Sequence, residues 1–526
     1  MPVNERARRL RGASWFPLAA GAIVAALALL AITAVPVGVF WDDGVYLIGA
    51  KSLATGAGYR FLHLPGAPPA IHYPPGWPAL LALVWRLNPS FPANVPLLKL
   101  VNPLLLGVCA MLVCAYGARR FAVPPLVAAA VAVVFTAALP LMVIAGVLFS
   151  EPMFFVVLMI ALALADRAVD EGGWRIALAA GLAAGASVLV RSAGLPLLPA
   201  LVIALLIARR RLEAAVAATG AVAVILPWQV WAAAHLHSLA APFRGSYGPY
   251  LDWVLALYRE RGAGFAVVMG RVNLLGMMRS LGIALFPFGP REIRPLLVTL
   301  VLVVAAIGAL RARKRATTAL LFLLFYFGVV FLWPYAPDRY LWALWPLTGM
   351  VLASGAVECW RIGAAPGAVK SVRATSAFAC TIGVFAIAGH AGYSVRGAAR
   401  HWWDSAARAN ADALLPVAAW INENTRPDDV VAVDGEPFIY LHTGRTVVPV
   451  HIASADEYVA GTPIEQAAAD LRSLILAGRP RYAVFSASAP EGEAAQLLDG
   501  KDGSPRLEWI AAVPGGGSAY RVVLAP

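Results

Sequence analysis

The stretch "FPLAAGAIVAALALLAITAVPVGVFWDDGVYLIGA", Phe16 to Ala50, decides the class of fold. Its apolar part extends to Phe40 and is longer than the roughly 20 residues that a helix needs to cross a bilayer. The basic segment 1–12 precedes it, and no small-residue cleavage signal follows. We therefore predict a retained signal-anchor helix over 15–40, with Asp42 and Asp43 at its end.

Composition extends this reading to the whole chain. Of 526 residues, 60% are hydrophobic and 13% charged, and the mean hydropathy is +0.73, whereas soluble domains are about one quarter charged. The net charge is +13, but from Arg396 onward acidic residues outnumber basic ones. The positive surplus lies in short loops between apolar runs, which is typical of a membrane protein and not of a nucleic-acid-binding surface. The four cysteines show neither metal-ligand nor disulfide spacing.

The apolar runs predict a polytopic α-helical membrane protein with about eleven spans. We place them at 15–40, 97–118, 121–147, 150–166, 174–190, 193–208, 212–234, 293–310, 316–333, 340–358 and 374–393. With the N-terminus in the cytoplasm, four basic clusters fall on the cytoplasmic side, as the positive-inside rule requires: 118–120, 209–211, 311–315 and 361–373. Region 262–290 is interrupted by Arg271 and Arg279, so we expect it to be interfacial.

Two domains follow from this topology. Residues 1–393 form the transmembrane domain, with outer loops at 41–96 and 235–291. Residues 394–526 alternate helical and strand patterns with turn residues between them, which predicts a small extracytoplasmic α/β domain.

Three acidic residues are candidates for chemistry. Asp42 or Asp43 could cap an amphipathic surface helix, or a carboxylate at this boundary could take a proton from a hydroxyl nucleophile. Glu151 could open a helix with Ser150 as its cap. Alternatively it has a functional partner, because a carboxylate at membrane depth costs several kcal/mol. The topology puts Glu151 on the same side as Asp42.

Other candidates share that side. The segment "HYPPGWP", His72 to Pro78, is a stiff loop with Trp77 as an anchor, read either as a re-entry turn or as part of a substrate site. His72 and His63 could ligate a metal together with Asp42 or Asp43, although no spacing supports this. Arg191 and Arg339 lie at outer helix ends. Arg339 could be an interfacial anchor, but we favour binding of a lipid phosphate by the outer arginines, because acidic and basic candidates converge on one face.

These stretches resemble motifs of a known superfamily. "DDGVY" with Tyr46, "YPPGWPALLAL" with Tyr73, "FSEPMFF", "LVRSAGLPLLPA" and "DRYLWALWP" occur in order along the chain. Together they resemble the GT-C superfamily of polytopic glycosyltransferases, in the branch of protein O-mannosyltransferases and lipid A aminoarabinose transferases. "WINENTRPDDVVAV" and "YLHTGRTVVPV" resemble the outer domain of many bacterial members.

The resemblance implies a GT-C-like enzyme of the bacterial inner membrane whose C-terminal domain is periplasmic or extracellular. Such enzymes transfer a sugar from a polyprenyl phosphate to a lipid, glycan or protein acceptor. Asp42 would be the catalytic or acceptor-orienting carboxylate, supported by Asp43 and Glu151, and Arg191 and Arg339 would bind the donor phosphate. No cofactor is certain, and a divalent cation is left open.

One departure limits this transfer of roles. Lipid A aminoarabinose transferases carry a lysine where this chain has Tyr73, so a phosphate contact by that lysine cannot be assigned here, and neither sugar nor acceptor is defined. Two alternatives remain. A transporter or flippase of a lipid-linked glycan would share the bundle and the arginines, and an inactive scaffold would tolerate loss of Asp42 and Glu151.

Overall fold

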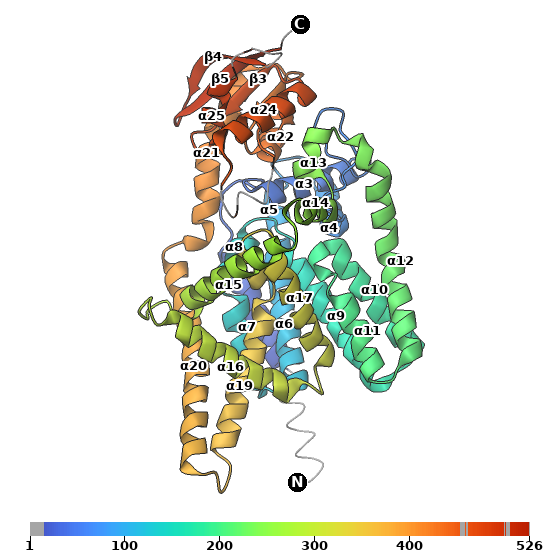
Figure 1. Ribbon diagram of the computed structural model, residues 1–526, viewed down its shortest axis with the longest axis vertical. Coiled ribbons are helices and arrows are strands. Elements are labelled where there is room, and N and C mark those ends of the chain that lie inside the picture. The colour runs from blue at the N-terminus through green and yellow to red at the C-terminus, as the bar shows by residue number, and fades with distance from the viewer. Residues whose placement is uncertain (1–14, 453–457, 459–460, 499, 501–504, 525–526) are drawn as a thin grey trace.

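The computed structural model describes residues 15–452, 458, 461–498, 500 and 505–524. The basic segment 1–12 lies outside the described residues. Figure 1 shows a helical bundle with a small domain of strands and helices at one end. The predicted class, a helical bundle followed by a small α/β domain, is confirmed.

Helices occur in all eleven segments predicted to span the membrane. Among the described residues, five helices are long and apolar enough to cross a membrane, or six if the pair α7–α8, bent by 53°, is one span. The bundle comprises α2 (Phe16–Leu30), α5 (Val95–Lys99), α6 (Val101–Arg120), α7 (Pro125–Thr136), α8 (Leu139–Gly146), α9 (Glu151–Glu171), α10 (Trp174–Val190), η1 (Ser192–Gly194), α11 (Leu197–Ile207), α12 (Arg211–His235), α16 (Arg294–Ala312), α17 (Thr317–Leu332), α18 (Asp338–Ala343), α19 (Trp345–Gly363) and α20 (Lys370–Ala399).

The first predicted span is wrong at its C-terminal end. Helix α2 stops at Leu30, and residues 31–40 run as a non-helical segment to the next helix. Pro36 has no amide hydrogen to donate, and Gly38 adopts a φ of +86°, which favours glycine. We call residues 31–40 the lead-in segment, because it leads into the helix that carries Asp42.

Three of the four predicted basic clusters gather at one end of the bundle. Arg120 contacts Asp170 and donates to the carbonyl of Arg315, and Arg210 donates to the carbonyl of Asp170. Arg311 bonds to the carbonyl of Ala122. The clusters 118–120, 209–211 and 311–315 therefore share one side, as the topology predicted.

The two predicted outer loops fold into helices at the other end. They comprise α3 (Trp41–Ala54), α4 (Gly76–Leu87), η2 (Leu236–Ser238), η3 (Ala241–Phe243), α13 (Arg244–Tyr247), α14 (Tyr250–Arg261) and α15 (Gly264–Leu285). Helix α3 is not the amphipathic surface helix that we considered, because it is buried continuously from Asp43 to Ala50. Helix α15 is not among the helices long and apolar enough to cross a membrane, and the Asn273 side chain donates to three carbonyls at the end of α17.

The C-terminal domain is built on one five-stranded sheet with the order β2-β1-β3-β5-β4. Strands β2, β1 and β3 are parallel, and β5 and β4 are antiparallel to their neighbours. The elements are α21 (Trp402–Asn424), β1 (Val430–Val433), α22 (Glu436–Thr443), β2 (Thr446–Val448), α24 (Ile464–Gly478), β3 (Tyr482–Phe485), α25 (Glu491–Ala494), η4 (Ala495–Leu497), β4 (Arg506–Val513) and β5 (Gly517–Val523). The boundary predicted at 393/394 falls inside α20.

Candidate active site

Four charged residues predicted for the site meet where four helices begin or end. Asp42 is in the first turn of α3, Glu151 is the first residue of α9, Arg191 directly follows α10, and Arg339 is in α18. The Arg339 guanidinium bonds to the carboxylates of both Asp42 and Glu151. Nη1 of Arg191 lies 3.0 Å from Oε1 of Glu151. The sequence thus predicted a cluster that the fold assembles.

Exposure separates the two carboxylates. The Glu151 side chain is fully buried, whereas the side chains of Asp42 and Arg339 are 23% and 27% exposed. A buried carboxylate needs its full charge compensated, and two arginines surround Glu151. Glu151 is therefore an internal counter-ion, and Asp42 is the carboxylate that solvent can reach.

Asp42 is held in its ionised form. The Tyr73 hydroxyl donates a hydrogen bond to one carboxylate oxygen, and Arg339 bonds the other. Burial by itself would raise the pKa of Asp42, but the charge of Arg339 and the bond from Tyr73 outweigh it and hold the pKa below its ordinary value. Tyr73 therefore donates a hydrogen bond to Asp42 from the position where lipid A aminoarabinose transferases carry a lysine.

Asp43 has a different task from Asp42. Its two oxygens accept the backbone amides of Gly38, at 2.7 Å, and Phe40, at 2.9 Å. The N-cap residue of α3 is Phe40, so the capping role considered for either aspartate belongs to Asp43 at the third helical position. Burial raises the pKa of Asp43 to about 7.

Ser150 connects Glu151 to neighbouring groups. Glu151 begins α9, as one of the two readings had it, but the side chain of Ser150 makes no capping bond. Its hydroxyl instead accepts from Nη1 of Arg191 at 3.0 Å and donates to the Tyr46 hydroxyl at 3.3 Å. Tyr46 therefore borders the cluster through Ser150.

Two polar atoms of the cluster are unused. Oε2 of Glu151 and Nη2 of Arg339 are buried and have no hydrogen-bond partner among the described residues. The Arg339 guanidinium also lies over the ring of Phe149, 3.8 Å from its centroid. One face of the guanidinium is therefore covered by Phe149, and Nη2 lies in the interior without an acceptor among the described residues.

His72 lines the site as part of an aromatic wall. Its Nδ1 donates to the carbonyl of Gly248 at 2.7 Å, and its ring lies 5.3 Å from Trp41 and 4.3 Å from Tyr250. Burial lowers the pKa of His72 to about 4, so the ring is neutral at physiological pH. Within the described residues, no group of three or more His, Cys, Asp or Glu is placed to hold a metal ion.

The predicted loop "HYPPGWP" packs inward. Trp77 is fully buried and donates its indole N–H to the carbonyl of Leu148 at 2.9 Å, so it is not the membrane anchor that we expected. At Gly76, a Cβ would lie 2.6 Å from the carbonyl oxygen of Leu189. Only glycine allows the loop this close to the end of α10, next to Arg191.

The sequence did not single out several residues around the site. Trp41 precedes the aspartate pair directly, and Tyr247 and Tyr250 come from the second outer loop. Glu436, from the C-terminal domain, accepts a hydrogen bond from Trp41. The sequence offered two hints: Trp41 stands next to the two aspartates, and Glu436 is an acidic residue within "DGEPF". Neither hint indicates that these two side chains contact each other.

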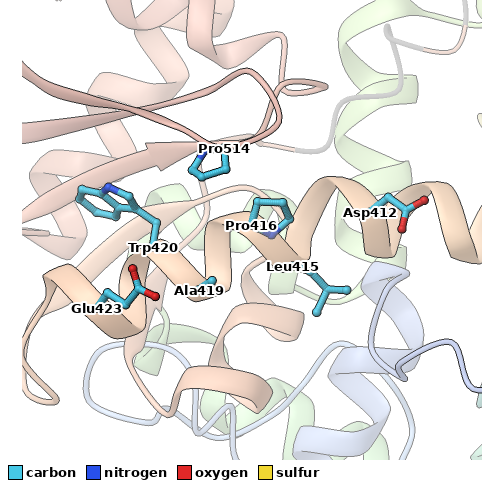
Figure 2. A pocket seen from close by; sticks show the side chains of 7 residues that line it. All are labelled: Asp412, Leu415, Pro416, Ala419, Trp420, Glu423 and Pro514. Atoms are coloured by element: carbon cyan, nitrogen blue, oxygen red, sulfur yellow. The ribbon is translucent and has the colours of Figure 1, made fainter.

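A groove of about 520 Å³ lies elsewhere, between α21 and the β4–β5 turn. Figure 2 shows its lining residues: Asp412, Leu415, Pro416, Ala419, Trp420, Glu423 and Pro514. It contains two carboxylates and no cation, and none of the four clustered residues lines it. The groove therefore lacks a group to hold a phosphate.

No family model and no curated protein match the chain. Solved structures that are similar include the crystal structure of ArnT from Cupriavidus metallidurans bound to undecaprenyl phosphate. It shares 15% identity over 97% of this chain and 98% of that chain, with a TM-score of 0.46. The apo structure of the same protein shares 16% identity over 96% and 98%, also with a TM-score of 0.46. With so little sequence in common, the chemistry of this chain rests on its own residues.

Proposed function

We propose that this chain is a membrane glycosyltransferase of the GT-C type. It would move a sugar from a polyprenyl phosphate to a lipid, glycan or protein acceptor at the extracytoplasmic face of a bacterial inner membrane. The observation that carries the proposal is the Asp42–Arg339–Glu151–Arg191 cluster. It combines one reachable carboxylate with two arginines, at the end of the bundle opposite the basic clusters.

The reaction requires few groups. The acceptor hydroxyl oxygen attacks the anomeric carbon, the bond from that carbon to the phosphate oxygen breaks, and the polyprenyl phosphate leaves with the electron pair. The hydroxyl proton passes to Asp42 or, through it, to water. Because a phosphate is a good leaving group, a weak base suffices, and the single displacement inverts the anomeric centre. No carboxylic acid is needed to protonate the leaving group, unlike in glycoside hydrolysis.

Asp42 fits the accepting role better than Glu151. It is ionised at neutral pH and partly exposed, and its neighbour Tyr73 fixes one oxygen. Glu151 is fully buried behind it and keeps Arg339 and Arg191 in place.

The arginines suit a phosphate that gains charge as it leaves. A guanidinium presents several N–H donors in one plane, and the Arg339 side chain is 27% exposed. A donor phosphate would reach Arg339 from the exposed side that also carries Asp42, so base and leaving group share one opening.

A deletion strain tests this function. Mass spectrometry of envelope lipids and glycans should show a sugar missing in the deletion, restored by the wild-type gene and not by Asp42→Asn. An unchanged envelope would contradict the proposal. Accumulation of a lipid-linked sugar on the cytoplasmic leaflet, with transfer intact in permeabilised cells, would favour a flippase instead.

A further inference from the structure

The C-terminal side of the chain holds the lead-in segment in place. The indole N–H of Trp403 donates to the carbonyl of Ala31 at 2.9 Å, and the Asn410 side chain donates to the carbonyl of Val39 at 3.1 Å. These carbonyls lack helical partners, because the lead-in segment is not helical. Helix α21 therefore holds the lead-in segment, which immediately precedes the helix that carries Asp42.

Glu436 is the meeting point of three outer segments. One oxygen of Glu436 accepts the indole N–H of Trp41 at 2.8 Å and the hydroxyl of Tyr247 at 2.6 Å. Nε2 of His63 in turn bonds to the Tyr247 hydroxyl at 2.8 Å. Trp41 and His63 come from the first outer loop, Tyr247 from the second and Glu436 from the C-terminal domain.

The network is buried and tightly packed. Glu436 is 5% exposed, and His63 and Tyr247 are fully buried. A buried carboxylate without partners is costly, and here two donors satisfy one oxygen. One turn beyond this contact, a Cβ on Gly44 would lie 2.6 Å from Cβ of Pro437, so α22 is seated directly on the first turns of α3.

We propose that Glu436 is a positioning residue for Asp42. It fixes the indole of Trp41, the residue before Asp42, and so sets the direction in which the first turn of α3 presents the Asp42 carboxylate to Tyr73 and Arg339. The C-terminal domain is thereby a part of the catalytic assembly. The effect on sugar transfer rests on the proposed function, whereas the effect on α3 does not.

Four variants show whether the role of Glu436 depends on its ability to accept hydrogen bonds, on its charge or on the size of its side chain. Glu436→Gln keeps an oxygen that can accept from Trp41 and Tyr247, Glu436→Leu removes it, and Trp41→Phe removes the indole donor. Glu465→Leu makes the same change at an exposed glutamate of the same domain and serves as the matched control.

Hydrogen exchange of the purified full-length protein provides a measurement that needs no substrate. Glu436→Leu should raise exchange in residues 40–47 about tenfold, since the first turn of α3 loses its tether. Glu436→Gln and Glu465→Leu should exchange as the wild type does. Unchanged protection of α3 in Glu436→Leu would overturn the proposal, whatever reaction the protein catalyses.

Kinetics supply the second arm. Glu436→Leu should lower kcat for sugar transfer by at least about tenfold, leave the affinity for undecaprenyl phosphate within about twofold, and add nothing in a Trp41→Phe background. Glu436→Gln should restore most of kcat. The positioning role of Glu436 would be refuted if the losses of kcat in Glu436→Leu and Trp41→Phe were additive. It would also be refuted if Glu436→Leu exchanged faster in α3 and yet kept the wild-type kcat. A wild type that transfers no sugar would instead refute the proposed function and leave the exchange result to decide the role of Glu436.

Discussion

Asp42 and Asp43 are neighbours in the chain whose carboxylates serve two different structures. Asp42 bonds to Tyr73 and Arg339 across the site, whereas Asp43 accepts the amides of Gly38 and Phe40 behind it. Successive residues of a helix point about 100° apart, so one aspartate can cap the helix while the other faces the site. The cap made by Asp43 determines where α3 begins, and this in turn determines the position of Asp42 in its first turn.

Asp43→Asn should lower stability and remove a pH dependence. Burial raises the pKa of Asp43 to about 7 from an ordinary 3.8, so between these values the folded protein binds more protons than the unfolded chain. Stability should therefore fall as pH rises from about 4 to about 7. Melting temperatures from pH 4 to 8 should show this slope in the wild type and lose it in Asp43→Asn. The variant should also lose about 0.5–2 kcal/mol from the weakened cap. An unchanged slope would show that Asp43 does not titrate in this window.

Glu151→Gln should destabilise the protein more than Asp42→Asn does. Removing the charge of the fully buried Glu151 leaves Arg191 without its counter-ion, and breaking such a pair costs about 3–5 kcal/mol. Asp42 is partly exposed, so its loss is compensated by water. Thermal unfolding of the two purified variants checks the order, and a reversed order would contradict the internal role of Glu151.

Arg339→Lys should reduce sugar transfer by at least about tenfold, and Arg191→Lys should reduce it less. A lysine has one small ammonium group and cannot bond Asp42 and Glu151 together as the Arg339 guanidinium does. Among the described residues, Arg191 bonds the adjacent Ser150 and Glu151, a single direction that an ammonium group can serve. Steady-state transfer rates compare the two, and equal losses would argue against the bridging role of Arg339.

Gly44→Ala should loosen the C-terminal domain from α3. The new methyl group would lie 2.6 Å from Cβ of Pro437, and overpacking of this kind costs about 1–3 kcal/mol. Gly328→Ala is the control, because a Cβ there meets nothing within 4 Å. Thermal unfolding should show a loss only for Gly44→Ala, and equal melting temperatures would mean that α22 is not seated on α3 as described.

The bundle could be predicted because apolar runs and basic loops are local signals. Helices lie in all eleven predicted segments, although among the described residues only five or six are long and apolar enough to cross a membrane, and three basic clusters share one side. The end of α2 at Leu30 was missed because the lead-in segment is apolar, although its Pro36 and Gly38 are local signals against a continued helix. Its backbone is held by Trp403 and Asn410, residues from the far end of the chain.

The cluster of Asp42, Glu151, Arg191 and Arg339 was predictable as a set on one side, but not as a geometry. Which carboxylate is exposed depends on how helices from four parts of the chain meet. Glu436 escaped notice because its partner Trp41 lies 395 residues away, and no local pattern connects them.

The most direct test is transfer of a polyprenyl-phosphate-linked sugar by the purified wild-type protein and by Asp42→Asn in lipid bilayers. We predict that the wild type transfers the sugar with inversion and that Asp42→Asn, folded and with its affinity for the polyprenyl-phosphate donor retained, is at least about 100-fold slower. Near wild-type transfer by Asp42→Asn would contradict the central claim that Asp42 is the reacting carboxylate.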